Sequence, residues 1–538
     1  MPEFNEARVL VADDASVVRQ SVRMTLSQTG ISRVDTAASV GEARRRLKNG
    51  VYDVVLCDYY FGEGTTGQEL LEEMRLTAEL PLSTIWFMIT AEASYEKVVA
   101  VAEIGPDDYL IKPFTSAKLT DRLKVAWEKK KFFRPVYDKI EQNDPHAAIE
   151  VLRDILEVAD QYRNDCLRLL SNLLLETGRL DEARVLLEEI LGSRIVPWAR
   201  LNLARVLNKQ GNKSQAEATL QSAISDHGQY VDAYEELANM YMAEGRLDEA
   251  MAVFEKCLSM TPNNVTRLQK AGNLANMLGD SAKARQMLEK AVTCGGNSSV
   301  LAPETVLQLA LAARRDNAHG DAEKYLKMVT AICQREDTLK NRVVGTLAST
   351  LFAGKADALG ELAEQVSRPD FTLELAVNWI MTADQVCPPT LPGEQADENV
   401  APYRWLAALA RRFVTTKYIS GMLESAASQR PEWQAYIQHI GQEVSELNRE
   451  GVQILMKNQF AEAMAKLLPA AQTTFNHRLM LSATHASIKA LQAGQVPDGE
   501  RKALIRKIDL FLERLQGNTD EGVLYGMRNE LDALAAEG

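Results

Sequence analysis

The sequence predicts a multidomain protein in which an α/β domain with a doubly wound parallel sheet is followed by an all-α region of helical repeats. Three observations predict this fold class. Residues 1 to about 125 alternate short β-rich apolar runs with helical stretches. Almost no strand pattern follows, because Ala, Leu, Glu, Gln and Arg dominate and apolar residues are spaced by three and four. Within this second region, a set of residue types recurs with a period of 34.

Five apolar runs rich in β-branched and aromatic residues define the expected strands of the α/β domain. They cover residues 8–12, 33–37, 53–57, 84–89 and 108–111, and helical stretches separate them at 17–28, 40–49, 68–77 and 94–104. After Thr115-Ser116, the expected N-cap, an amphipathic segment runs to Lys131. It leads toward the repeats with little flexible linker apart from Arg134-Pro135. This alternation favours a parallel sheet covered by helices on both faces.

The bulk composition excludes several classes of protein. The chain has 538 residues, of which 46% are hydrophobic and 25% charged, as is ordinary for soluble globular proteins. Its 61 Lys and Arg against 74 Asp and Glu give a net charge of −13, which argues against broad nucleic-acid binding. The six cysteines form no C-x-x-C pair, and no signal peptide or run of transmembrane length is found. We therefore expect a cytoplasmic protein with reduced cysteines and no membrane insertion.

A pattern of three residue types recurs in the helical region, in segments that begin at residues 163, 197, 231 and 265. Each segment carries a glycine, a small residue five positions later and a large apolar residue four further on: Gly178, Ala183, Leu187; Gly211, Ala216, Leu220; Gly245, Ala250, Phe254; Gly279, Ala284, Leu288. The glycine suits the end of a first helix, and the alanine suits close helix packing. This signature resembles the tetratricopeptide repeat (TPR), which implies helix pairs stacked into a superhelix.

The pattern weakens on both sides of this array. Partial matches indicate further repeats near Lys131, Pro303 and Val444, and the proline-rich segment 387–402 is an expected surface loop. We expect the following domains: residues 1–127, the α/β domain; 128–162, a junction and atypical first repeat; 163–334, the repeat array; 335–402, a helical segment with the proline-rich loop; 403–538, C-terminal helical repeats.

Polar side chains follow four of the expected strands, at the point where each strand ends. They are Asp13 with Asp14, Asp58, Thr90 and Lys112. Because ligands bind at the carboxyl ends of the strands in a doubly wound parallel sheet, we expect these side chains at one edge of the sheet. Three carboxylates, a hydroxyl and an ammonium together predict a Mg²⁺ site with a phosphate-accepting carboxylate.

In their order along the chain, these residues and Pro113 resemble the CheY-like receiver domain of two-component response regulators. The resemblance implies a flavodoxin-like (βα)5 fold. It also implies that Asp58 is the nucleophile that accepts a phosphoryl group, with catalytic support from the Lys112 ammonium and the Thr90 hydroxyl. Mg²⁺ is the implied cofactor, and its implied ligands are Asp13, Asp14, Asp58 and the backbone carbonyl of Tyr60. The alternative is a degenerate receiver that is not phosphorylated.

The switch of the receiver family is recognisable as well. The resemblance implies that the Thr90 hydroxyl moves toward the phosphoryl group, that Tyr109 turns inward, and that the bond before Pro113 is cis. One feature departs from the family, because Gly67 is nine residues after Asp58 whereas most receivers have a glycine eight residues after the acceptor. The longer loop lies beyond the expected metal ligands, so we expect the metal site to be retained.

One row of polar residues recurs on the first helix of each repeat, the helix that lines the concave surface in repeats of this type. The row consists of Asn172, Arg205, Asn239 and Asn273, with Asn208 and Asn276 one turn further on. Asparagine is a mediocre residue inside a helix, so its recurrence favours contacts with the backbone of a bound peptide. The alternative is that these are solvated polar positions. Similarly, Trp198 is either a groove anchor or a packed core aromatic.

The region from residue 130 to 538 contains no helix-turn-helix reader, nucleotide-binding glycine loop or hydrolase nucleophile motif. We therefore expect no separate catalytic output domain, and the only chemistry expected is phosphorylation and dephosphorylation of Asp58. The sequence predicts a bacterial response regulator that a sensor histidine kinase or phosphotransfer protein phosphorylates, and whose repeats bind a protein partner. Alternatives are a constitutive TPR adaptor, a dimerisation scaffold or a phosphate sink without regulated output, with a DNA-binding regulator more distant.

Overall fold

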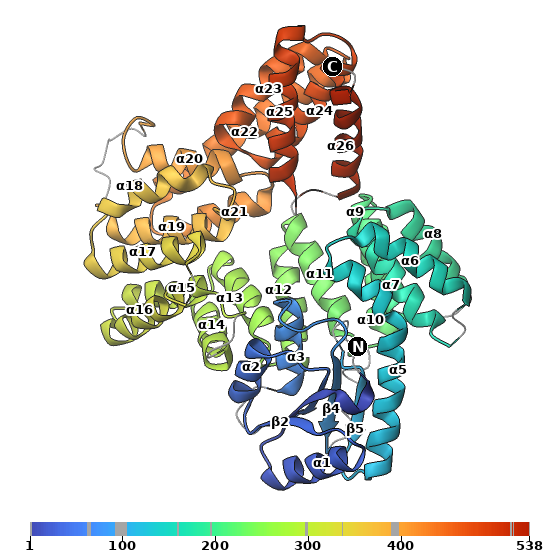
Figure 1. Ribbon diagram of the computed structural model, residues 1–538. Coiled ribbons are helices and arrows are strands. Elements are labelled where there is room, and N and C mark those ends of the chain that lie inside the picture. The colour runs from blue at the N-terminus through green and yellow to red at the C-terminus, as the bar shows by residue number, and fades with distance from the viewer. Residues whose placement is uncertain are drawn as a thin grey trace. The chain divides into compact units, whose positions relative to one another are not determined.

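The computed structural model of the chain describes residues 3–61, 66–91, 105–158, 161–193, 196–295, 300–335, 337–388, 397–516, 519 and 521–536 (Figure 1). The chain divides into two compact units, which are described separately. The first contains Met1–Met240, Ala252–Leu268 and Lys290–Leu301, and the second contains Tyr241–Met251, Gln269–Glu289 and Ala302–Gly538. Among the described helices, none combines the length and the apolar character that spanning a bilayer requires.

Five parallel strands form one sheet in the order β2-β1-β3-β4-β5. The strands are β1 (Arg8–Ala12), β2 (Arg33–Ala37), β3 (Val54–Asp58), β4 (Ile85–Thr90) and β5 (Asp108–Ile111), and the connecting helices include α1 (Ser16–Gln28), α2 (Val40–Asn49) and α3 (Gly67–Leu76). The parallel order confirms the predicted flavodoxin-like fold, and each strand begins and ends within one residue of its predicted range. The helix expected over residues 94–104 lies outside the described residues.

Helices cover both faces of this sheet, because successive side chains of a strand point to opposite faces. On one face, Leu10 and Trp86 belong to an apolar cluster that includes residues of α2 and α3. On the other face, Leu56 and Phe87 pack in a cluster with residues of α1 and of α5 (Ser116–Glu141). The two layers of helices leave the carboxyl ends of the strands as the place where polar residues gather.

Helix α5 joins the α/β domain directly to the repeats. Thr115 caps its first turn, as predicted, and the helix continues through Pro135 to Glu141. The expectation that Arg134-Pro135 would interrupt it is wrong. A proline inside a helix removes one backbone hydrogen bond. The neighbouring Phe133 is buried in an apolar cluster that includes residues of α6 (Pro145–Val158) and α7 (Arg163–Glu176), and this packing keeps the helix continuous.

The second half of α5 is also fixed to the α/β domain. The buried Lys130 ammonium donates to the Leu82 carbonyl at 2.8 Å and lies 2.9 Å from a carboxylate oxygen of Asp107. The backbone N–H of Leu82 in turn donates to the Glu141 carboxylate at 3.1 Å. These contacts hold α5 against the segments that precede β4 and β5, so the junction is a rigid connection.

The repeat region consists of consecutive helices. They are α6 (Pro145–Val158), α7 (Arg163–Glu176), α8 (Leu180–Ser193), α9 (Pro197–Lys209), α10 (Lys213–Asp226), α11 (Val231–Glu244), α12 (Leu247–Met260), α13 (Val265–Met277), α14 (Ser281–Gly295), α15 (Pro303–Arg315) and α16 (His319–Cys333). The four predicted repeat starts coincide with the first residues of α7, α9, α11 and α13. The four glycines of the pattern all have positive φ, from +69° to +82°, which explains why glycine ends each first helix.

Asparagine takes the place of this glycine in three other helix pairs. Asn143, Asn317 and Asn458 have φ values of +59°, +59° and +62°. Each precedes by five residues a small residue of the partial matches, namely Ala148, Ala322 and Ala463. Because asparagine tolerates the left-handed conformation better than most residues, it can replace glycine at this turn.

The C-terminal part of the second unit contains further helices joined by turns in its described residues. Its helices are α17 (Leu339–Ala353), α18 (Asp357–Glu364), α19 (Leu373–Val386), α20 (Tyr403–Phe413), α21 (Lys417–Ala426), α22 (Pro431–Met456), α23 (Phe460–Thr474), α24 (His477–Gln492), α25 (Asp498–Leu515) and α26 (Glu521–Ala536). Helix α22 begins at Pro431, earlier than the repeat predicted near Val444, which stays a prediction; Gly451 of α22 lies against Leu467 of α23. Buried Trp433 and Ile437 extend the apolar face of α22 toward the N-terminus, and proline is favoured in a first turn.

Helix α3 begins with a capping box in which Thr66 and Glu69 exchange hydrogen bonds. Burial raises the pKa of the Glu69 carboxyl from 4.5 to about 7, opposed by the Thr66 N–H and reinforced by the Glu72 carboxylate. The folded chain therefore holds this proton more tightly than the unfolded chain. The stabilisation is fully present below pH 4.5 and is lost as the pH rises to about 7.

We predict that Glu69→Gln removes this pH dependence while keeping the cap, because the amide oxygen can still accept from Thr66. The free energy of opening of β3 and β4, measured by native-state hydrogen exchange, should fall in the wild type between pH 4.5 and 7.5. The fall should be about 2 kcal/mol larger than in the Glu69→Gln variant. If the difference in opening free energy between the wild type and Glu69→Gln did not change with pH, the raised pKa of Glu69 would be contradicted.

Candidate functional site

Three carboxylates meet at the carboxyl end of the sheet. Asp13 and Asp14 follow β1, and Asp58 ends β3, the neighbouring strand. Ligand oxygens of the three side chains all lie within 4.8 Å of one another. Asp13 and Asp58 are buried, with 1% and 7% of their surface exposed, whereas Asp14 is exposed. The cluster is therefore a half-open acidic pocket that solvent reaches from the side of Asp14.

The Lys112 ammonium lies against two of these carboxylates. Its Nζ is 2.8 Å from an oxygen of Asp13 and 3.1 Å from an oxygen of Asp58. Although burial opposes the shift, both carboxylates raise the pKa of Lys112, so the side chain stays charged at neutral pH. It supplies one positive charge to a pocket that contains three acidic side chains.

Burial raises the pKa of the Asp58 carboxyl, and the Lys112 ammonium opposes this rise. Asp13 is held by the backbone instead, because one of its oxygens accepts a hydrogen bond of 2.8 Å from the Ala15 N–H. Arg19 donates to the carbonyl oxygens of Asp13 and Asp14 at 2.5 and 2.9 Å. Arg19, in helix α1, is a supporting residue that the sequence reasoning missed.

The remaining residues implied by the receiver resemblance lie near the same edge. In the register of β3 and β4, Asp58 is opposite Ile89, so Thr90 is one residue beyond it. Thr90 is 3% exposed, and its carbonyl accepts from the Lys112 N–H at 2.7 Å. Tyr109, on the adjacent β5, is buried in the apolar cluster that α2 and α3 cover. The Lys112–Pro113 peptide bond is cis, as the resemblance implied.

Residues 59–61 and Thr66 are the described part of the segment between β3 and α3. The side chain of Tyr60 is exposed, and its backbone forms an isolated bridge with Thr66. Residues 62–65 of the longer loop lie outside the described part of the chain. Gly67, the first residue of α3, donates its N–H to the Tyr59 carbonyl at 2.8 Å. A Cβ atom at Gly67 would be 2.2 Å from the Asp58 carbonyl oxygen and 2.9 Å from the Cys57 sulfur, so only glycine fits.

This donor set is suited to a hard divalent cation. Mg²⁺ takes oxygen ligands and commonly binds through carboxylates together with water and phosphate oxygens. Two buried carboxylates and one exposed carboxylate provide such ligands from one side, and the open side leaves room for a phosphoryl group. A cation would offset the repulsion among the three carboxylates, which Lys112 alone offsets only in part.

Two members of the polar row on the repeats contact neighbouring helices in the first unit. Asn172 accepts from the buried amide of Asn202 at 2.6 Å, and Arg205 pairs with Glu236 at 3.0 Å. Asn208 and Asn239 are half-buried on α9 and α11. The sequence reasoning missed Asn202 and Glu236, because neither occupies the repeating position that defines the row.

The other two members belong to the second unit. Asn273 is half-buried on α13, and its side-chain oxygen has no hydrogen-bond partner among the described residues. The backbone carbonyl of Asn276 accepts from the Ser425 hydroxyl at 3.2 Å. Trp198, the alternative groove anchor, packs at the edge of the apolar cluster formed with α6 and α7, which favours the structural interpretation.

Comparison with known proteins finds two kinds of match. A model of the response regulator receiver domain matches residues 9–124, and tetratricopeptide repeat models match residues 139–194 and 201–265. The chain is 34% identical over 122 residues to the chemotaxis protein CheY-3 of Vibrio cholerae, covering 23% of this chain and 92% of the relative. It is 28% identical over 122 residues to the chemotaxis protein CheY of Pseudomonas aeruginosa, covering 23% and 97%.

Two solved structures each match part of the chain. The chemotaxis response regulator CheY4 of Vibrio cholerae is 31% identical, and the match covers 22% of this chain and 98% of that chain with a TM-score of 0.21. MamA is 23% identical, and the match covers 30% of this chain and 95% of that chain with a TM-score of 0.26.

The close approach of Gly67 to Asp58 predicts a large effect of one methyl group. Gly67→Ala should destabilise the α/β domain by about 3 kcal/mol, because the backbone carbonyl cannot move aside as a flexible side chain could. Gly41→Ala in α2 is the matched control, since a Cβ there meets nothing closer than 3.9 Å. Native-state hydrogen exchange of β3 measures both. Equal stability of the two variants would contradict the steric argument.

Proposed function

We propose that this chain, which belongs to the response regulator receiver family, accepts a phosphoryl group on Asp58 and uses its TPR region to bind a protein partner. The observation that carries the proposal is the acidic pocket at the sheet edge with Lys112 across it. Such a pocket provides a nucleophile, a metal-binding donor set and a compensating positive charge at one place. The phosphoryl donor would be a sensor histidine kinase or a phosphotransfer protein.

The reaction forms one bond and breaks another. A carboxylate oxygen of Asp58 attacks the phosphorus of a phosphohistidine, the P–N bond breaks, and the imidazole leaves and regains a proton from solvent. The Lys112 ammonium and the Thr90 hydroxyl offer a positive charge and a hydrogen bond to oxygens of the transferred group. Mg²⁺, held by Asp13, Asp14, Asp58 and the Tyr60 carbonyl, would supply further positive charge.

The output proposed is a protein–protein contact. Tetratricopeptide repeat models match residues 139–194 and 201–265 after the receiver domain. The polar row on α7, α9, α11 and α13 would offer side-chain hydrogen bonds to a bound peptide. We propose that phosphorylation of Asp58 controls this binding, and that the protein acts in the cytoplasm. A constitutive TPR adaptor or dimerisation scaffold, and a phosphate sink without regulated output, are the competing functions.

The first test addresses the phosphoryl acceptor. The wild-type protein, incubated with acetyl phosphate and Mg²⁺, should gain the mass of one phosphoryl group, and a chelator should slow this gain at least about a hundredfold. Asp58→Ala should gain none, whereas Asp121→Ala, which removes an exposed carboxylate of α5, should react like the wild type. Intact-protein mass spectrometry measures the gain. Phosphorylation of Asp58→Ala at the wild-type rate would contradict the assignment.

The second test addresses the output. Affinity capture from a lysate should recover a partner that depends on a beryllofluoride phosphate mimic and is lost with Asp58→Ala. Asn239→Ala, on the polar row, should weaken capture about tenfold without affecting phosphorylation of Asp58, since one or two hydrogen bonds would be lost. If the same partners bind in every state, the constitutive adaptor is correct. Light scattering on the same samples distinguishes a dimerisation scaffold.

A further inference from the structure

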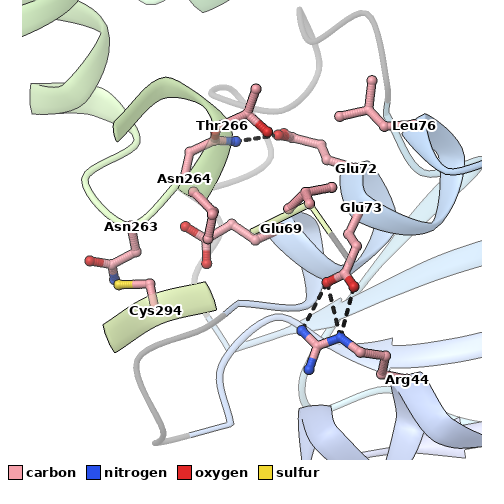
Figure 2. Close-up of a pocket in the computed structure, with 11 residues that line it drawn as sticks. Arg44, Glu69, Glu72, Glu73, Leu76, Asn263, Asn264, Thr266 and Cys294 are labelled. Carbon is pink, nitrogen blue, oxygen red and sulfur yellow. Dashed lines mark hydrogen bonds and ion pairs between the residues drawn. The ribbon is translucent and has the colours of Figure 1, made fainter. Parts of the chain in front are cut away.

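A small polar cavity lies between receiver helix α3 and the segment that leads into repeat helix α13 (Figure 2). Both elements belong to the first compact unit at this point. Its lining includes Arg44, Glu69, Glu72, Leu76, Asn264 and Cys294. The face that α3 presents is acidic, and the repeat side presents the Asn264 amide, with the Arg267 guanidinium 3.8 Å from Glu72. The two sides therefore have complementary chemistry.

Asn264 uses both ends of its side-chain amide. Its oxygen accepts from the Arg267 N–H at 2.9 Å and so caps the first turn of α13. Its nitrogen donates to a carboxylate oxygen of Glu72 at 2.6 Å, as Figure 2 shows. Asn264 is 7% exposed, and the Glu72 side chain is 14% exposed, so the bond is shielded from water. Loss of the Glu72 carboxylate would leave the buried Asn264 amide nitrogen without this acceptor.

Arg267 brings a second interaction to the same carboxylate. Its guanidinium lies 2.8 Å from Glu235, 3.7 Å from Asp232 and 3.8 Å from Glu72. Although burial opposes the shift, the three carboxylates raise the pKa of Arg267, with Glu72 first among them. Two of these carboxylates come from repeat helix α11 and one from the receiver. The guanidinium keeps two partners if the receiver carboxylate moves away.

Glu72 is mechanically connected to the phosphoryl acceptor. It lies on α3 five residues after Gly67, which is about 7.5 Å along the helix. Gly67 rests against the Asp58 carbonyl with no room for a Cβ, and the capping box of Thr66 and Glu69 fixes the first turn. A displacement of the Asp58 backbone must therefore carry α3 with it. At a donor–acceptor distance of 2.6 Å, a shift of about 1 Å ends the hydrogen bond with Asn264.

We propose that Glu72 of the receiver, together with Asn264 and Arg267 of the repeats, forms a latch that is closed while Asp58 is unmodified and is released by its phosphorylation. The release rests on the proposed function, whereas the closed latch does not. The latch exists with Lys112 paired directly to Asp58. A phosphoryl group on Asp58 replaces that pair and carries about two negative charges in place of the single carboxylate charge, so it adds about one negative charge beside the start of α3. Release frees the first turn of α13, the helix that also carries Asn273 and Asn276.

Asn264→Asp tests the latch with minimal damage to the fold. Aspartate caps a helix as well as asparagine does, so α13 keeps its first turn. The substitution nevertheless removes the donor and places a carboxylate against Glu72. Adding Glu72→Gln should restore the bond with reversed polarity, because the glutamine amide can donate across the interface. Its oxygen can still accept from Gln68, which donates to Glu72 at 3.0 Å. The double variant also conserves the net charge.

Hydrogen exchange of the amides in the second half of α3 and the first turn of α13 measures the latch in the full chain. Exchange should rise about tenfold in Asn264→Asp and return to within about twofold of wild type in the double variant. Asn212→Asp, the same change at the start of α10, should have no effect. Unchanged exchange in Asn264→Asp, or a double variant that is no better than the single one, would overturn the latch.

The same measurement on wild-type protein phosphorylated with acetyl phosphate and Mg²⁺ tests release. Its exchange should match that of Asn264→Asp, and by linkage Asn264→Asp should shift the phosphorylation equilibrium toward the phosphorylated form by the same factor. Phosphorylated protein with unchanged exchange would overturn release alone. If no phosphoryl group is gained, the proposed function and the release both fail, while the comparison of unmodified variants still decides whether the closed latch exists.

Discussion

No side-chain carbon fits between the first residue of α3 and the carbonyl oxygen of Asp58. A Cβ at Gly67 would approach that oxygen to 2.2 Å, a distance that no relaxation of a flexible side chain could relieve. This steric constraint fixes the acceptor residue and the start of the helix as one rigid body. It also explains how the one-residue extension of the preceding loop is tolerated. The steric requirement is for a glycine against the end of β3, and Gly67 meets it although it is nine residues after Asp58.

The charge balance of the pocket depends on the same packing. The sheet brings Asp13 and Asp58 together because β1 and β3 are neighbours, and Lys112 reaches both from the end of β5. Burial disfavours an isolated charge, so the ammonium and the carboxylates stabilise one another in their ionised forms. The excess of acidic groups is what makes the pocket suited to a divalent cation, and a phosphoryl group needs that cation for the same electrostatic reason.

The strands, the clustering of the acidic residues at the sheet edge and the central repeats could be predicted because each leaves a local pattern in the sequence. Apolar runs followed by Asp13, Asp58 and Lys112 place these residues at one sheet edge once the strands are parallel. The outer repeats were harder to recognise, because Asn143 and Asn317 stand where the pattern has glycine and only their positive φ shows the equivalence. The extent of α5 was missed for a different reason, since apolar packing of Phe133 outweighs the local effect of Pro135.

The contact of Glu72 with Asn264 leaves no local pattern at all, because 192 residues separate the two side chains. Only the folded chain brings them together, and it does so beside a second connection that is continuous, the helix α5. Two attachments can be compared: buried contacts of Lys130 hold α5 to the receiver, and in the described part of the chain Glu72 of α3 contacts Asn264 and Arg267 of the repeats. A change at Asp58 acts on α3 through Gly67, and α5 has no comparable contact with Asp58 among the described residues. The contact of Glu72 with the repeats is therefore the attachment through which Asp58 can influence them. The contacts of α5 keep the receiver joined to the repeats when the Glu72 contact opens.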